Sequence, residues 1–239
     1  MKRRFFVVIH ALSLEEYGPL ALPHVRDSAR IAFEEGAHGV FLIPDYVKGF
    51  VKAKISDLSI YYDFLNEEYQ SKDFLIGVNF LLRRSELDGQ LENLVSEISP
   101  TMLQTDYLSA TVTKHYYPYT QIFGSFAFKG SKQESVTGEE LEVLAKLAEN
   151  YCDVPTTSGA ATGVAAPFEK VKEIRSYLKD ETRLGLASGV SAHSVKSFMD
   201  AGATDFLVAT SLIKEVKDKR DILDPELVKK MVRAVRSYG

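Results

Sequence analysis

Six polar residues follow six separate apolar segments of this chain, which is where active-site side chains are expected. They are His10, Asp45, Asn79, Asp106, Lys129 and Ser158. An imidazole or a carboxylate transfers protons, and a lysine amine acts as a base, an electrophile or a Schiff-base nucleophile. Asn79 stands in an apolar segment, where a buried amide needs a partner, and indicates a substrate contact. The catalytic candidates are His10, Asp45, Asn79, Asp106 and Lys129.

Three turns rich in small residues lie in the second half of the chain, at 158–163, 188–189 and 210–211. Gly, Ser, Thr and Ala leave backbone N–H groups accessible, and turns of this kind favour anions where they lead into a helix. We therefore expect a phosphate group at these turns. The candidate phosphate ligands are Ser158, Gly159, Thr162, Gly163, Ser188, Gly189, Thr210 and Ser211.

Hydrophobic patterning predicts the elements that position these residues. Strands are expected at 5–9, 39–43, 74–80, 101–105, 121–128, 153–156, 184–187 and 206–209. Helices are expected at 24–35, 56–69, 85–98, 137–150, after Pro167, 191–201 and 225–237, with a short helix within 108–119 and a long loop at 11–23. Alternating strands and helices form a parallel sheet, either doubly wound or closed. Eight units in 239 residues favour a single-domain (β/α)₈ TIM barrel over residues 1–239, since such barrels have about 250 residues.

A TIM barrel brings the two sets of candidates together, because active sites lie at the carboxyl ends of its strands. The loops after strands 7 and 8 are the usual phosphate site of this fold. Strands 1 to 6 end in reactive side chains and strands 7 and 8 end in small residues, so we expect one reactive half of the rim and one phosphate-binding half.

The composition restricts the classes of partner that the chain is expected to bind. The net charge is -4 and the pI is near 5.8, which gives no electrostatic argument for nucleic acid or for an anionic membrane. No apolar run reaches the roughly 18 residues of a membrane span, and residues 1–12 are interpreted as the first strand, not a signal peptide. The only cysteine, Cys152, excludes an internal disulfide and is interpreted as a buried small residue. These features favour a reducing, cytoplasmic location.

Each candidate also has a purely structural interpretation. His10 is equally typical of a core histidine, Asp45 and Asp106 of turn caps, and Lys129 of a solvated rim residue. The other histidines, among them His24, are interpreted as surface residues. No spacing specifies a metal, and we assign none, although His10, Asp45 and Asp106 are able to meet around a divalent ion such as Mg²⁺.

Five segments carry a family resemblance. They are VIHAL at 8–12, GVNFLLR at 77–83, FAFKG at 126–130, TSGAATG at 157–163 and ASGVSAHSV…ATSLIK within 187–214. Together they resemble the BtpA family of TIM barrels, which includes photosystem I biogenesis factors and SgcQ-like sugar-metabolism proteins. The resemblance implies a ribulose-phosphate-binding type of barrel, with phosphate at Ser188, Gly189, Thr210 and Ser211. It puts His10, Asn79 and Lys129 on matching polar positions. The chain departs from the family at Tyr17-Gly18-Pro19, at Pro44-Asp45 and at Gly130.

The sequence thus predicts a cytoplasmic TIM-barrel enzyme that acts on a small phosphorylated metabolite, either a sugar phosphate or a nucleotide-derived compound. Aldol, isomerase or lyase chemistry fits the residues at the rim. Two alternatives stay open: an FMN-binding barrel, whose cofactor would present its phosphate to the same turns, and a non-enzymatic assembly factor. Neither FMN nor Mg²⁺ has a specific motif here, and assembly into a homo-oligomer is compatible with the sequence.

Overall fold

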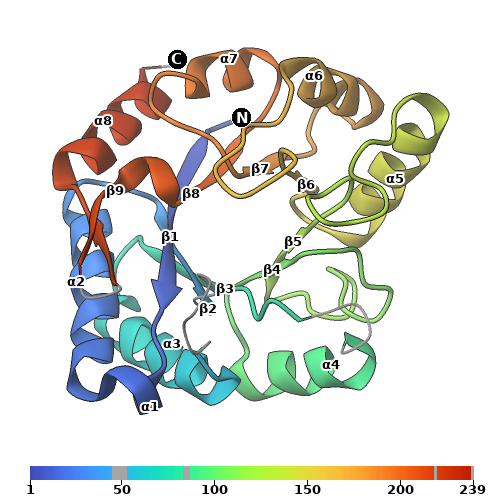
Figure 1. Ribbon diagram of the computed structural model, residues 1–239. Coiled ribbons are helices and arrows are strands. Elements are labelled where there is room, and N and C mark those ends of the chain that lie inside the picture. The colour runs from blue at the N-terminus through green and yellow to red at the C-terminus, as the bar shows by residue number, and fades with distance from the viewer. Residues whose placement is uncertain (45–52, 83–86, 218–219, 238–239) are drawn as a thin grey trace.

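Eight parallel strands form one sheet that curls into a barrel (Figure 1). The computed structural model describes residues 1–44, 53–82, 87–217 and 220–237. The strand order is β5-β4-β3-β2-β1-β8-β7-β6, and a bridge between Ser125 and Thr156 joins the two ends. The strands are β1 (Arg4–Ala11), β2 (Gly39–Pro44), β3 (Leu75–Val78), β4 (Met102–Thr105), β5 (Gln121–Gly124), β6 (Thr156–Thr157), β7 (Gly185–Ala187) and β8 (Asp205–Val208). The predicted TIM-barrel fold is confirmed.

Helices cover the outside of the barrel (Figure 1). They are α2 (Ala21–Glu34), α3 (Ile55–Tyr69), α4 (Leu87–Ile98), α5 (Gly138–Tyr151), α6 (Phe168–Tyr177), α7 (Val195–Asp200) and α8 (Pro225–Arg236). In α2, the apolar stripe Val25, Ala29 and Ala32 is fully buried. Helix α8 begins after Asp224, whose carboxylate accepts the Glu226 N–H. No helix among the described residues is long and apolar enough to cross a membrane.

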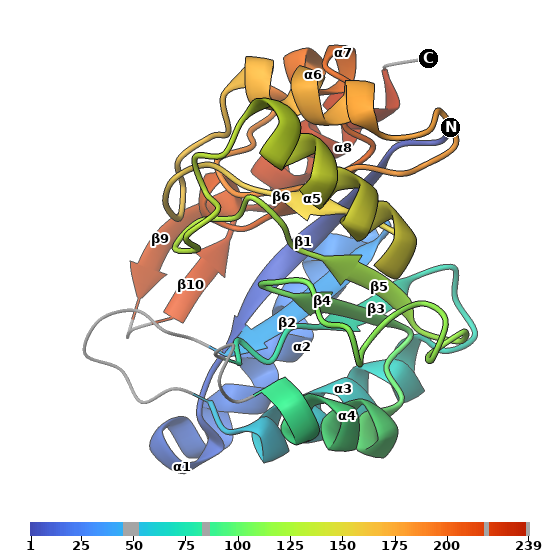
Figure 2. The ribbon, with the colours of Figure 1, turned by 90° about the vertical axis from the view of Figure 1, so that its right-hand side faces the viewer.

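Several connections differ from the sequence-based prediction. The expected short helix after β4 does not form, because the Ser109 hydroxyl accepts the N–H groups of Thr111 and Val112 and holds a turn there. The loop after β1 contains the short helices α1 (Leu14–Tyr17) and η1 (Gly18–Leu20). After β8 and the turn η3 (Thr210–Leu212), the antiparallel hairpin of β9 (Ile213–Lys217) and β10 (Arg220–Leu223) was not predicted. It projects from the face where the parallel strands end (Figure 2).

The strands on either side of the barrel seam are shorter or shifted relative to prediction. Strand β5 ends at Gly124, and Ala127, at φ +45°, then turns the chain. Strand β6 begins only at Thr156, because Asp153 and Val154 both donate their N–H groups to the Ile122 carbonyl and Pro155 has none to donate.

An aromatic cluster fills the centre of the barrel. The rings of Phe6, Phe41 and Phe123 meet edge to face, with centroids 5.1 to 5.8 Å apart. Gly77 makes room for this cluster, since a Cβ there would lie 2.5 Å from the Phe41 ring. Side chains alternate between the two faces of a strand, so Val8 and His10 share the inner face with Phe6. This alternation aims the strand-end residues into the barrel mouth.

A charged cluster closes the opposite end of the barrel. Asp205 is fully buried and accepts from Arg4 Nε at 2.5 Å and from Arg183 Nε at 2.7 Å. Arg4 also donates to the Gln121 side chain at 2.8 Å, and burial lowers the pKa of its guanidinium. Because one carboxylate is bonded to two arginines, the first strand is tied to β8 and to the segment that leads into β7.

We predict that Asp205→Ala lowers the free energy of unfolding by about 3–5 kcal/mol, because two largely buried guanidinium groups lose their partner. Urea unfolding measures this change. The matched control is Asp200→Ala on α7, where the ion pair with Lys196 is exposed and is worth less than about 1 kcal/mol. Equal effects of the two substitutions would contradict the role given to Asp205.

Candidate functional site

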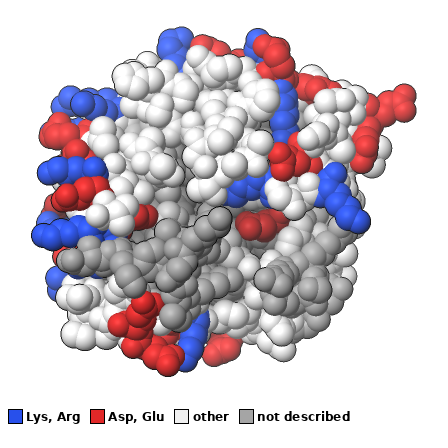
Figure 3. Space-filling view, viewed as in Figure 1, with Lys and Arg blue, Asp and Glu red and all other residues white. Residues whose placement is uncertain are grey.

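A cavity of about 540 Å³ opens at the carboxyl ends of the strands. Its volume lies within the range of small-molecule sites, about 300–1,000 Å³. Among the described residues on the face shown in Figure 3, most charged side chains lie toward the periphery. Apolar side chains from several strands also line the cavity, among them Val8, Ile43, Phe128, Ala187 and Leu207.

The structure brings most of the predicted site residues to this cavity. Those that line it are His10, Asn79, Asp106, Lys129, Thr162, Gly163, Ser188, Gly189, Thr210 and Ser211. Ser158 and Gly159 do not line it, and Asp45 lies outside the described residues. Gln104 also lines the cavity and is a candidate that the sequence analysis missed. The alternation along β4 was the available indication, since Gln104 stands two residues before Asp106 and two after the inward-facing Met102.

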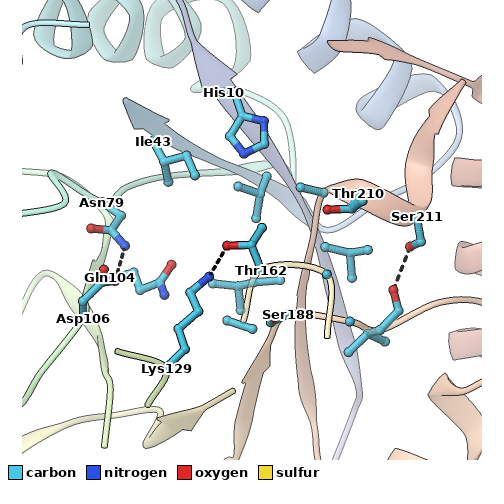
Figure 4. A pocket seen from close by; sticks show the side chains of 18 of the residues that line it. His10, Ile43, Asn79, Gln104, Asp106, Lys129, Thr162, Ser188, Thr210 and Ser211 are labelled. Atoms are coloured by element: carbon cyan, nitrogen blue, oxygen red, sulfur yellow. Dashed lines mark hydrogen bonds between the residues drawn. The ribbon is translucent and has the colours of Figure 1, made fainter. Parts of the chain in front are cut away.

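The polar wall of the cavity consists of His10, Asn79, Gln104 and Asp106. Asn79 is 3% exposed and donates from Nδ2 to Asp106 Oδ1 at 2.9 Å. Its Oδ1 accepts the N–H of Leu81 at 2.8 Å, which helps to hold Leu81 in a left-handed conformation at φ +50°. The Asn79 amide thus orients the Asp106 carboxylate at the rim of the cavity (Figure 4).

Lys129 reaches into the cavity from the loop after β5 (Figure 4). Its Nζ donates to Thr162 Oγ1 at 3.3 Å and lies 5.6 Å from the centroid of the Phe128 ring. Its backbone N–H donates to Ser158 Oγ at 2.9 Å. Ser158 is fully buried and donates in turn to the Gly159 carbonyl, so it positions the Lys129 turn from behind the cavity.

Three turns bond to one another and form the small-residue wall, which comprises residues 161–165, 188–191 and 209–212. Ser188 Oγ donates to the Ala161 carbonyl at 2.7 Å and to the Val164 carbonyl at 3.1 Å. Ser211 Oγ donates to the Val190 carbonyl at 2.7 Å. These hydroxyls hold the turns together, and the cavity on this side is lined by Thr162, Gly163, Gly189 and Thr210, whose backbone N–H groups and hydroxyls are of the types that bind anions.

Glycine is required in the second of these turns. Gly189 has φ +64°, and a Cβ on it would lie 2.1 Å from the backbone nitrogen of Ala165. Any other residue would therefore separate the turns after β6 and β7. Across the cavity mouth, a Cβ on Gly163 would lie 3.9 Å from the Thr210 side chain, so the first and third turns also face each other.

Lys170 on α6 is a positioning residue that the sequence did not reveal. Its Nζ donates to the carbonyls of Ala127 at 2.5 Å, Ser158 at 3.1 Å and Glu134 at 3.2 Å. An ammonium has three N–H donors, and each has an acceptor here. Burial lowers the pKa of this amine. Lys170 thus joins the turns after β5 and β6 next to the seam between those strands.

His10 has a carboxylate partner from the unpredicted hairpin. Its Nδ1 is hydrogen-bonded to Asp221 Oδ2 on β10, and its backbone carbonyl is 3.2 Å from His24 Nε2. Asp221 lies 211 residues away along the chain, so no sequence pattern pointed to it. The surface position predicted for His24 is wrong: its side chain lies under β1 and is 7% exposed, because α2 packs on that strand. Burial lowers the pKa of His24.

Among the described residues, no group of three His, Cys, Asp or Glu side chains is arranged to hold a metal ion. Asp45, which the sequence grouped with His10 and Asp106, is outside that set of residues. Cys152 is 2% exposed, as predicted, and burial raises the pKa of its thiol to about 12. The thiol therefore stays protonated and unreactive near neutral pH.

No protein family and no characterised protein matches the chain by sequence. Thiamine phosphate pyrophosphorylase from Pyrococcus furiosus is similar in structure, with a TM-score of 0.64 at 14% identity over 99% of this chain and 97% of that one. A native KDPGal structure gives 0.66 at 12% identity over 99% and 96%. Phosphoribosyl anthranilate isomerase from Thermus thermophilus gives 0.63 at 11% identity over 99% and 100%. These similarities show the TIM-barrel fold.

We predict that Lys170→Met lowers the free energy of unfolding by at least about 2 kcal/mol, because carbonyls at two turns lose a charged donor. It should also speed hydrogen exchange at the Phe126 N–H, which bonds Thr156 across the seam. Lys172→Met, two residues along the same helix and 60% exposed, is the matched control. Equal exchange rates at Phe126 in the two variants would exclude this role for Lys170.

The buried His24 predicts a pH dependence of stability. Its folded pKa is below the ordinary 6.5, so the unfolded chain binds the proton more readily. The stability that His24 contributes as a neutral buried ring is fully present above the pKa of the ring in the unfolded chain. It is lost as the pH falls through the pKa of the ring in the folded chain. Urea unfolding between about pH 7.5 and about pH 5.5 should show a smaller loss of stability for His24→Gln than for the parent chain. His193→Gln, at an exposed position, should keep the parent slope.

Proposed function

We propose that this chain binds a small phosphorylated metabolite in the barrel-mouth cavity and catalyses proton transfer on it, in an isomerase, lyase or aldol reaction. The observation that carries the proposal is the division of one cavity into two chemically different sides. The small-residue wall offers backbone N–H groups and hydroxyls. The polar wall offers an imidazole, a carboxylate and two amides. A ligand with an anionic end and a reactive end matches both.

The hydrogen bonds within the small-residue wall support the proposal that this wall binds phosphate. The hydroxyls of Ser188 and Ser211 are bonded to carbonyls of neighbouring turns, so these turns keep their shape without a ligand. A rigid turn of small residues binds an anion through N–H groups at little entropic cost. Lys129, bonded to the Thr162 hydroxyl at the edge of this wall, adds a positive charge.

Proton transfer at the other side is supported by Asp106 and His10. Asp106 is held by the Asn79 amide, and His10 is held by Asp221. Oriented groups of these types serve as general acids and bases. In this proposal Lys129 stands between the two sides and stabilises negative charge that develops on the substrate. The buried Gln104 amide orients a polar group of the substrate.

The structural neighbours support the same class of ligand. The names of two of them, thiamine phosphate pyrophosphorylase and phosphoribosyl anthranilate isomerase, include a phosphorylated compound. We also propose that the chain belongs to the BtpA family, and the motifs at 157–163 and 187–214 support this proposal. A cytoplasmic location is also proposed and is supported by the single cysteine, which excludes internal disulfides.

The test is a thermal-shift screen of the full chain with inorganic phosphate, sugar phosphates, nucleoside monophosphates and FMN, each with and without Mg²⁺. A true ligand at a hundred times its Kd adds about 2.7 kcal/mol, which raises the melting temperature by roughly 5–10 °C for a chain of this size. The same sugars without phosphate should give no shift. A shift with FMN alone would favour the flavin alternative.

The Thr210→Glu variant tests whether the phosphorylated ligand binds at the small-residue wall. Thr210 is exposed and lines the cavity, so a carboxylate there repels a phosphate without disturbing the core. The ligand-induced shift should disappear in this variant. It should persist in Ser96→Glu, which adds the same charge on the exposed side of α4. If no phosphorylated compound stabilises the parent chain, the proposal is wrong and a non-enzymatic assembly role gains support.

A further inference from the structure

The hairpin after β8 brings a carboxylate to the first strand of the barrel. Residues 213–223 leave the barrel as β9 and return as β10, with Leu223 paired to Ile213 and 7% exposed at the base. The exposed side of the hairpin is β9, whereas β10 is partly covered. This places Asp221 against His10, and the two side chains are 16% and 11% exposed.

The bond between these residues determines which nitrogen of His10 carries a proton. An ionised carboxylate only accepts hydrogen bonds, so Nδ1 must donate to Asp221. In the neutral ring the lone pair then lies on Nε2. Figure 4 shows the ring above the cavity, between the Asn79–Asp106 pair on one side and Thr210 on the other. In the described part of the chain, titratable groups near this pair include His24, which bonds the His10 carbonyl, and Arg220, the neighbour of Asp221.

We propose that Asp221 is the positioning residue of a His10–Asp221 dyad in which His10 is the general base for the reaction at this cavity. This inference rests on the proposed function. In the forward step, the His10 Nε2 lone pair forms a bond to a substrate proton, and the electrons of the broken C–H or O–H bond stay on the substrate. The imidazolium is balanced by the Asp221 carboxylate, which keeps its charge. In the return step, the same Nε2 delivers the proton to product.

The dyad explains why the chain carries a hairpin after β8. The β8 strand itself is followed by Ala209, Thr210 and Ser211, which belong to the small-residue wall and carry no acid or base. A turn that led directly into α8 would leave His10 without its carboxylate. The hairpin therefore serves the reactive side of the cavity, although it follows the strand that serves the anion side.

Long-range ¹H–¹⁵N NMR of the ¹⁵N-histidine-labelled full chain at about pH 7.5 tests the dyad without any ligand, since it reports the tautomer of each neutral ring. The His10 signals are identified by their loss in His10→Gln. We expect the Nδ1–H tautomer for His10 in the parent chain and the Nε2–H tautomer in Asp221→Ala. Asp221→Asn, the nearly isosteric change, should weaken the preference for Nδ1–H. Glu215→Gln, which neutralises an exposed carboxylate on β9, should leave it unchanged.

An Nε2–H or doubly protonated His10 ring in the parent chain would overturn the dyad. So would an Nδ1–H tautomer that survives in a folded Asp221→Ala chain, with folding checked by its melting transition. Once the thermal-shift screen has named a substrate class, Asp221→Asn should lower kcat by about a hundredfold or more, with little change in KM. Thr210→Glu should instead raise KM.

The two proposals fail in distinguishable ways. A tautomer that depends on Asp221, in a chain that no phosphorylated compound stabilises, would support the dyad and reject the phosphorylated substrate. A phosphorylated ligand that binds, while the His10 tautomer ignores Asp221, would support the proposed function and reject the dyad.

Discussion

The structure depends on the aromatic cluster in the barrel centre. Phe6 and Phe41 come from the neighbouring strands β1 and β2 and Phe123 comes from β5; the three rings meet edge to face, and the bare Cα of Gly77 lets them approach. Because strand side chains alternate with a period of two, this contact also sets what stands above it. Shifting β1 by one residue would move Phe6 out of the barrel centre and turn His10 away from the cavity. The same strand register therefore determines both the packing of the barrel centre and the orientation of the site residues.

The seam of the barrel is its least regular part and lies beside the site. Only a single bridge joins β5 to β6, and β6 has two residues. Side chains bonded to backbone compensate for the missing strand pairing, chiefly Lys170 with its three carbonyls. Non-glycine residues with left-handed backbones also gather at strand ends near the cavity, namely Leu81, Ala127 and Ser188. Each such residue costs about 1–3 kcal/mol and persists only where its surroundings hold it. Here those surroundings are the hydrogen bonds that shape the cavity.

The cavity combines a wall of small residues with a polar wall. On the first wall, the hydroxyls of Ser188 and Ser211 join the turns to one another. On the second wall, Asn79 holds Asp106, and Asp221 holds His10. Under the proposed function, groups that are oriented before the substrate arrives would lower the entropic cost of the reaction. The same barrel hosts many reactions, so these partners, and not the fold, carry the functional argument.

The sequence by itself determined the barrel and most of its rim. Apolar runs, amphipathic stripes and helix caps are local patterns, and the position of a residue at a strand end follows from them, so His10, Asn79, Asp106 and Lys129 could be found in advance. The helix expected within 108–119 did not form, because local hydroxyl bonds compete with helix formation. Only the tertiary structure decided that Ser158 supports a turn from behind, that Lys170 joins two turns and that Asp221 reaches His10. These contacts join residues 12 to 211 positions apart. No periodicity encodes them, since they arise only when the strands have closed around their common core.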